Sequence, residues 1–297
     1  MNDEWNRMRT SGSLAAQDSF GNVLRDWRRR RRMSQLDLSC DADVGKKHLS
    51  LLESGRSRPA RSMVLHLAEC LDVPLRVRNT MLVAAGYAPA YQQRNFLVPD
   101  MAVARRNVEL VLAGHDPFPA MAVDRHWMMI SANKAVANLV TGAEPMLLRP
   151  PVNLLRLCLH PAGLACRIVN LVEWRAHITA RLRREIDTTG DAGLVDLLEE
   201  IRDYPSPPGG QPARAAAAPH TVAMPFQLVT IDGTLSFFNT TTRFSTPMDI
   251  TLSELAIEAF LPADPHTAAV LRRDAQRCQA PETYVPASAN HWVAATA

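Results

Sequence analysis

The sequence lacks the features that mark several classes of protein. Its longest charge-free candidate for a membrane span, residues 215–231, is interrupted by Pro219, His220, Pro225 and Gln227, and it falls short of the roughly 20 apolar residues that a span needs. The first residues include acidic side chains and no apolar core, so we expect no secretory signal. Five cysteines at scattered positions argue against a disulfide framework and favour buried thiols in a reducing, cytoplasmic compartment.

Signatures of catalysis and metal binding are also missing. The C-x-H-x5-C spacing of residues 158–166 matches no structural zinc pattern. The glycine pair at 209–210 lies in a proline-rich run and not between a strand and a helix, so it does not predict a phosphate loop. Asp124 and His126 have no obvious nucleophile beside them. We therefore expect no metal, no resident cofactor and no enzymatic activity.

The composition is that of a globular protein with an uneven charge distribution. Hydrophobic residues make up 47% and charged residues 21% of the 297 residues, which suits two domains with buried cores. The first 61 residues carry 13 Lys and Arg against 8 Asp and Glu, whereas the remainder carries 20 against 22. A local basic excess, including the run at 28–32, favours a polyanionic partner. A solvated basic face is the alternative.

Hydrophobic periodicity predicts five short helices within residues 20–86. Apolar side chains recur there at three- and four-residue spacing, and tight turns separate the segments. Ser34 and Ser62 are the expected N-caps of the second and fourth helices. The third helix is expected at about 46–53, and the fifth ends at Gly86.

The second and third of these helices, separated by a turn at 43–45, have the spacing of a helix-turn-helix. Leu49 and Leu52 would face inward, which leaves the N-terminal residues of the third helix free to meet base edges in the major groove. The helix end before Leu36 and the loop after the third helix can bind phosphates. The candidate DNA-binding residues are Gln35, Gly45, Lys46, Lys47, His48, Ser50, Arg56 and Arg58.

The second half of the chain has a mixed pattern, which makes the whole an α+β protein. Strands are expected at 120–132 and at 221–260, with Asp232-Gly233 as a hairpin turn and 249–260 as the last strand. Residues 152–203 are rich in helix. The predicted organisation is a disordered tail (1–18), a DNA-binding domain (19–90), a connector (91–100), a second domain (101–278) with a flexible loop (205–219), and a tail (279–297).

The first domain resembles the Cro/C1-type (XRE) helix-turn-helix family. The resemblance covers residues 20–86 and depends on Ser34-Gln35, Leu36, Leu38, Val44, Leu49-Ser50, Glu53, Gly55 and Pro59. It implies an all-α, five-helix, lambda-repressor-like domain that binds double-stranded DNA. Two residues depart from the family pattern: Asp43 replaces the usual turn glycine, and Gly45 replaces the usual Ser or Thr cap.

The longer chain, over about residues 20–276, is similar to the MmyB/MltR-like regulators. The stretches VDRHW, NLVEWRAH and LSFFNTTTRFSTPMDITLSELAIEAFLPAD carry this resemblance. It implies a PAS-like ligand-binding domain, an antiparallel sheet with flanking helices, and an apolar ligand of the fatty-acid type.

A pocket of this kind would lie between the sheet and its helices, and ordinary core packing is the alternative for each apolar candidate. Arg156 and His160 could bind a carboxylate together, or Arg156 could form a structural salt bridge. The candidate ligand-binding residues are Met121, Val123, Met129, Leu154, Arg156, Leu157, His160, Phe226, Leu228 and Phe237. The polar–aromatic group of Asn170, Glu173, Trp174, Arg175 and His177 is expected in interdomain or dimer packing rather than at the ligand.

Taken together, the sequence predicts a cytoplasmic transcriptional regulator that binds a specific DNA sequence and senses a small apolar molecule. One recognition helix reads only a half-site, so we expect a homodimer. Two alternatives stay open: the second domain could serve only dimerisation or docking of a partner protein, or it could be an enzyme attached to a helix-turn-helix.

Overall fold

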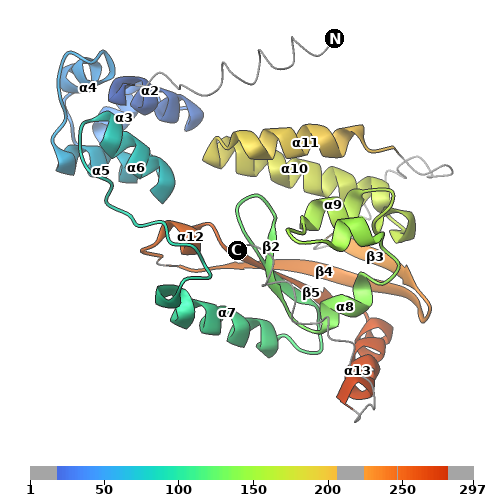
Figure 1. Ribbon diagram of the computed structural model, residues 1–297. Coiled ribbons are helices and arrows are strands. Elements are labelled where there is room, and N and C mark those ends of the chain that lie inside the picture. The colour runs from blue at the N-terminus through green and yellow to red at the C-terminus, as the bar shows by residue number, and fades with distance from the viewer. Residues whose placement is uncertain (1–18, 206–223, 246, 280–297) are drawn as a thin grey trace, which may run out of the picture. The chain divides into compact units, whose positions relative to one another are not determined.

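The computed structural model describes residues 19–205, 224–245 and 247–279 (Figure 1). The chain divides into two compact units. The first runs to Gln93 and includes Met248–Ile250, and the second contains the rest from Arg94 onward. Except for Pro205 and Gln279, the predicted tails at 1–18 and 279–297 and the predicted loop at 205–219 lie outside the described residues.

In its described residues, the first unit is built mainly of helices. Its helices are α2 (Phe20–Arg30), α3 (Gln35–Asp41), α4 (Lys46–Glu53), α5 (Arg61–Cys70) and α6 (Leu75–Ala84). The apolar faces predicted from the periodicity meet in one core, in which Leu24, Leu38, Leu49, Leu67 and Leu82 are fully buried. The predicted five-helix domain is therefore confirmed.

One expected cap in this unit is correct and the other is wrong. Ser34 caps α3 in a capping box with Asp37: the Asp37 backbone N–H donates to the Ser34 hydroxyl, and the Ser34 N–H donates to the Asp37 carboxylate. Ser62 does not cap α5. The first helical bond runs from the Val64 N–H to the Ala60 carbonyl, so the helix begins at Arg61 and has no side-chain cap.

The second unit contains a five-stranded antiparallel sheet. Its strands are β1 (Ala120–Val123), β2 (Met129–Ala132), β3 (Pro225–Thr230), β4 (Gly233–Arg243) and β5 (Ala256–Pro262), in the order β2-β1-β5-β4-β3. The predicted β3–β4 hairpin is present, but its turn lies one residue before Asp232-Gly233: Ile231 and Asp232 form the loop, and Gly233, at φ +103°, begins β4 opposite Thr230. The α+β class with an antiparallel sheet is confirmed, and the PAS-like arrangement stays a prediction.

The last strand is shorter than expected. Residues 249–260 were expected to be a single strand, but a helical turn, α12 (Ile250–Ser253), precedes β5. Leu252 and Leu255 lie three residues apart, which suits a helical turn, and both pack in the same apolar cluster. Strand alternation begins only at Ala256.

Helices cover both faces of the sheet (Figure 1). On one face α7 (Ala102–Gly114) packs against Ala120, Ala122, Ile257 and Ala259. The opposite face carries Met121, Val123 and Phe260 and packs against the larger core of α9 (Leu154–Leu159), α10 (Leu171–Thr189) and α11 (Ala192–Asp203). This division follows the period-two alternation of each strand. The remaining helices are α8 (Ala135–Leu139), α13 (Pro265–Gln279), η1 (Pro99–Met101), η2 (Pro145–Leu148) and η3 (Ala165–Arg167).

Candidate functional sites

The turn before α4 points the N-terminal residues of this helix into solvent. Asp43 adopts the left-handed conformation with φ +48°, which a turn aspartate tolerates, and Gly45 is the N-cap of α4. Leu49 and Leu52 are buried against the core. The four polar residues of the helix predicted to meet bases are exposed: Lys46, Lys47, His48 and Ser50. Their contact with DNA stays a prediction that this geometry permits.

Exposed arginines lie at the ends of two helices of the first unit. Arg56 and Arg58 are exposed in the loop that leaves the helix at Gly55, whose φ is +71°. Arg29 and Arg30 at the end of α2 are also exposed. None of these four side chains forms an ion pair with an acidic residue in the described part of the chain, so their charge is available to phosphates.

The buried end of α4 is held by a carboxylate that sequence reasoning did not single out for this role. Glu53 is 2% exposed. Arg28 binds it at both oxygens, with Nε to Oε1 at 2.6 Å and Nη2 to Oε2 at 2.9 Å. The Gln35 amide donates to Glu53 Oε2 at 2.8 Å, and Arg25 donates to the Glu53 carbonyl at 2.6 Å. Side chains from α2 and α3 thus converge on one residue of α4, and we call this group the Glu53 clamp.

The clamp changes the interpretation of two predicted residues. Arg28 belongs to the basic run for which the sequence left a polyanionic partner and a solvated face open, but it is only 8% exposed and serves as the ion-pair partner of Glu53. Gln35 was expected to hold a phosphate, and in the structure its amide nitrogen is committed to Glu53. Burial raises the pKa of Glu53, but the hydrogen bonds from Arg28 and Gln35 outweigh burial and leave this pKa below its ordinary value.

α2 also approaches α4 closely enough to require glycine. A Cβ on Gly21 would lie 2.6 Å from the carbonyl oxygens of both Leu52 and Glu53. Because backbone atoms cannot move aside cheaply, any side chain here would push the two helices apart. The orientation of the recognition helix is therefore fixed by shape at Gly21 and by charge at Glu53.

The second unit contains an apolar cavity between the sheet and its helices. The cavity has a volume of about 20 Å³, enough for about one water molecule. Its lining is entirely apolar apart from one thiol: Met121, Met129, Val136, Leu139, Val140, Leu154, Leu157, Cys158, Leu164, Phe226 and Phe260. We call it the apolar cavity.

Half of the residues predicted to bind a ligand line this cavity: Met121, Met129, Leu154, Leu157 and Phe226. Val123, Leu228 and Phe237 are buried in the same core without lining it. Arg156 forms the structural salt bridge, because its guanidinium binds Glu200 with Nη2 to Oε2 at 2.7 Å. The Tyr204 hydroxyl also donates to Glu200, and the His160 ring packs edge-on against Tyr204 at 5.1 Å.

A second, smaller cavity of about 10 Å³ adjoins the first. The two share Leu154, Cys158 and Phe260. The rest of the second lining is part apolar, with Leu155 and Ile178, and part polar, with Trp127, Trp174, Arg181, Asn239 and Glu258. We call it the polar cavity. Sequence reasoning missed its polar residues, and it placed Trp174 in interdomain or dimer packing, whereas Trp174 is 2% exposed within the core of the second unit.

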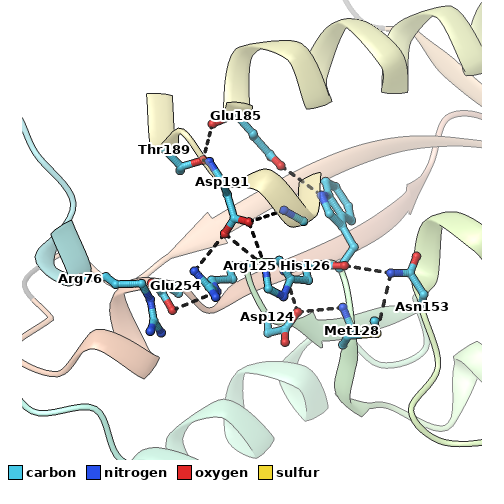
Figure 2. A network of polar contacts seen from close by, with 12 residues as sticks. Arg76, Asp124, Arg125, His126, Met128, Asn153, Glu185, Thr189, Asp191 and Glu254 are labelled. Carbon is cyan, nitrogen blue, oxygen red and sulfur yellow. Dashed lines mark hydrogen bonds and ion pairs between the residues drawn. The ribbon is translucent and has the colours of Figure 1, made fainter. Parts of the chain in front are cut away.

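The turn between β1 and β2 is tied to the helices that cover the cavities (Figure 2). The His126 ring meets both carboxylate oxygens of Asp191 at 3.1 and 3.2 Å, and Arg125 pairs with the same carboxylate at 2.9 Å. Asp191 is also the N-cap of α11. The Trp127 indole N–H donates to Glu185 on α10 at 3.0 Å. The turn therefore fixes Trp127 in the wall of the polar cavity.

The free cysteines of the described residues are spread over both units. No three His, Cys, Asp or Glu side chains come together there as a metal site. Of the four cysteines whose side-chain burial is described, only Cys158 is buried, and Cys40 and Cys166 are exposed, so the expectation of buried thiols is wrong for these two. Burial raises the pKa of Cys158 to about 12, which keeps it a neutral thiol. No helix in this part of the chain has the length and apolar character needed to cross a bilayer.

Comparisons with known proteins agree with this two-part organisation. A family model described as the MmyB-like transcription regulator ligand binding domain matches residues 104–273, and one described as a helix-turn-helix domain matches residues 19–81. No curated protein matches the sequence significantly. Among solved structures, an RNA-binding light-oxygen-voltage receptor aligns over 93% of this chain and 69% of its own, with 11% identity and a TM-score of 0.25, which is too low to support an argument.

Proposed function

Because this chain belongs to the MmyB-like transcription regulators and carries a helix-turn-helix domain, we propose that it binds a specific operator as a homodimer and that a small apolar molecule controls this binding. The observation that carries the proposal is the geometry of α4. Leu49 and Leu52 on its apolar side are buried in the core. Lys46, Lys47 and His48 in its N-terminal turn are exposed to solvent. Lysine and histidine there can donate to the acceptors that guanine presents in the major groove.

The apolar cavity is the site that we propose for the ligand, and its small size requires its walls to move when the ligand binds. An apolar ligand of the fatty-acid type needs a pocket of about 300 Å³ or more, whereas the cavity measures about 20 Å³. Such a ligand must therefore move its walls. Met121 and Met129 line the cavity, and methionine adapts easily to a changed shape. A ligand that binds only the opened arrangement shifts the population toward it, which is the requirement for regulation.

Ligand binding is tested by narrowing the cavity. Val136→Ile adds one methylene to the apolar cavity. We expect methyl dodecanoate, an uncharged fatty-acid ester, to raise the Tm of the wild-type protein, and we expect Val136→Ile to reduce this rise, while the ligand-free protein keeps its stability to within about 1 kcal/mol. The measurement is thermal unfolding with and without the ester. It is paired with mass spectrometry of small molecules that co-purify with the protein.

Val152→Ile is the matched control, because Val152 is 1% exposed in the same core and lines neither cavity. This variant should retain the ligand-induced shift. If the wild-type protein shows no shift and carries no small molecule, the second domain serves dimerisation or protein docking alone.

The dimer we propose uses the outer face of α7. Val103 and Leu110 lie seven residues apart on this face and are 74% and 62% exposed, with the exposed Arg106 and Glu109 beside them. If two copies of α7 pair antiparallel about a two-fold axis, Val103 lies opposite the partner's Leu110 and Arg106 lies near the partner's Glu109. The face is therefore complementary to itself in both shape and charge, as an isologous interface requires.

Replacing Val103 and Leu110 together with aspartate is expected to convert the protein to a monomer and to weaken operator binding at least tenfold, because the second half-site contact is lost. Light scattering coupled to size exclusion gives the mass. Val195→Asp, which changes an exposed valine on α11, should leave the dimer intact. A dimer that survives both aspartates would place the interface elsewhere.

A further inference from the structure

One residue that lines the polar cavity, Trp174, carries a buried hydrogen-bond donor without a partner among the described residues. The Trp174 side chain is 2% exposed, and its Nε1–H has no hydrogen-bond partner among the described residues. Buried indole N–H groups are normally paired, because an unpaired donor loses its bond to water without gaining another. The other tryptophan of this cavity follows that rule, since Trp127 donates to Glu185 at 3.0 Å.

Trp174 lies next to the apolar cavity in which we place the ligand. Leu154, Cys158 and Phe260 form a common wall of the apolar and polar cavities, and Phe226 of the apolar cavity packs against the Trp174 ring at 5.0 Å. A long apolar ligand that opens the apolar cavity would therefore place one of its ends in the polar cavity. The two cavities together make an apolar site with one polar end.

The charges at this polar end are already balanced. Arg181 binds Glu258 with Nη2 to Oε1 at 2.6 Å, and Glu258 is 1% exposed. Arg181 also contacts Glu185 at 3.2 Å, and its guanidinium lies 4.4 Å from the centre of the Trp127 ring. Glu185 in turn lies 3.8 Å from Arg243. The walls therefore carry one cation and one anion that neutralise each other.

Two titratable groups beside this ion pair, His177 and Cys158, are uncharged. His177 stacks on Trp174 at 5.5 Å, and its pKa is lowered by burial and by the nearby Arg181 and Arg184, which keeps the ring neutral at physiological pH. Cys158 is a neutral thiol. A carboxylate at this end would have to take Arg181 from Glu258 and leave a buried anion unpaired, which is strongly unfavourable.

We propose that the ligand is an apolar chain with an uncharged, acceptor-bearing head group, such as an ester, a ketone or a protonated carboxylic acid, and that the Trp174 Nε1–H donates to this head. The inference depends on the proposed ligand-binding function and adds the chemistry of the head. Arg181 is already ion-paired with the buried Glu258, and this pairing disfavours the binding of an ionised carboxylate. A fatty acid then binds in its neutral form.

The test compares two probes of equal chain length, 2-octanone and octanoate, by calorimetric titration of the full-length protein at pH 8. 2-Octanone is expected to bind at least tenfold more tightly than octanoate. Trp174→Phe keeps most of the ring and removes the donor, so it should weaken 2-octanone about fivefold, the value of one neutral hydrogen bond. It should leave octanoate unchanged.

Tyr204→Phe is the matched control, because it removes from the second unit a hydroxyl donor that already has a partner, Glu200, and Tyr204 lines neither cavity. This variant should retain the preference for the ketone. In the wild-type protein, 2-octanone should also shift the Trp174 indole N–H resonance downfield, a readout that needs no variant.

The outcomes separate the two proposals. If neither probe binds, ligand sensing at this site fails. If both bind but octanoate binds more tightly, or if Trp174→Phe leaves 2-octanone unaffected and the indole resonance does not move, the assignment of the head group is overturned while ligand sensing stands.

Discussion

Replacing Lys47 and His48 together with alanine is expected to abolish discrimination between the operator and unrelated DNA. A side chain that reads a base contributes about 1–3 kcal/mol, and a dimer presents each one twice, so operator affinity should fall at least about 100-fold. Both residues are exposed on α4, and their removal leaves the packing of Leu49 and Leu52 intact. The unfolding free energy should change by less than about 0.5 kcal/mol. Competition footprinting measures the discrimination directly.

Lys134→Ala provides the matched control, since it removes an exposed lysine from the second unit. It should leave both the footprint and its salt dependence unchanged. If the Lys47 and His48 variant gives the wild-type footprint, the assignment of α4 as the recognition helix is wrong.

Local sequence signals predicted the helical unit well. The third helix was expected at 46–53, and α4 spans those residues, because its periodicity, its turn and its stop at Gly55 all lie within a dozen residues. The Ser34 cap belongs to the same class of short-range signal. The two wrong predictions, an N-cap at Ser62 and a single strand at 249–260, also concern local structure. A serine near the start of a helix does not determine where the first turn begins. The spacing of two leucines cannot by itself distinguish a helical turn from a strand.

Contacts between residues that lie far apart in the sequence could not be predicted from the sequence. Arg28 and Glu53 lie 25 residues apart, and Arg181 and Glu258 lie 77 apart. Nothing in the spacing of such residues shows that they meet, because tertiary packing brings them together. The same limit explains why half of the predicted ligand residues line the apolar cavity and why the polar cavity was missed. Apolar character identifies the core, but the places where a core is incompletely filled depend on how the side chains interlock.

Replacing Glu53 with glutamine is expected to destabilise the first unit by about 3–5 kcal/mol. The change leaves Arg28, only 8% exposed, without its counter-ion, and breaking a buried ion pair on one side has this cost. The residual folded protein should also bind the operator poorly, because the end of α4 is no longer held to α2 and α3. Hydrogen exchange of the α4 amides reports this loosening separately from global unfolding.

The companion variant tests whether charge or packing is responsible. Arg28→Met combined with Glu53→Leu removes both charges and fills a similar volume, so most of the stability should return, while the orientation of α4 then depends on Gly21 and apolar packing alone. If single and double variants lose equal stability, the ion pair is not the cause.

The same carboxylate gives the first unit a defined dependence on pH. The folded-state pKa of Glu53 lies below its ordinary value of 4.5, so the unfolded state takes up the proton first as the pH falls. The stabilisation from the clamp is complete above about pH 5 and is lost as the pH falls through the folded-state pKa. In denaturant titrations from pH 7 to pH 3, the wild-type unit should lose this stability, and the Arg28→Met, Glu53→Leu variant should show a flatter profile. An equally steep profile in the double variant would assign the acid sensitivity to other carboxylates. The clamp would then act through shape and not through charge.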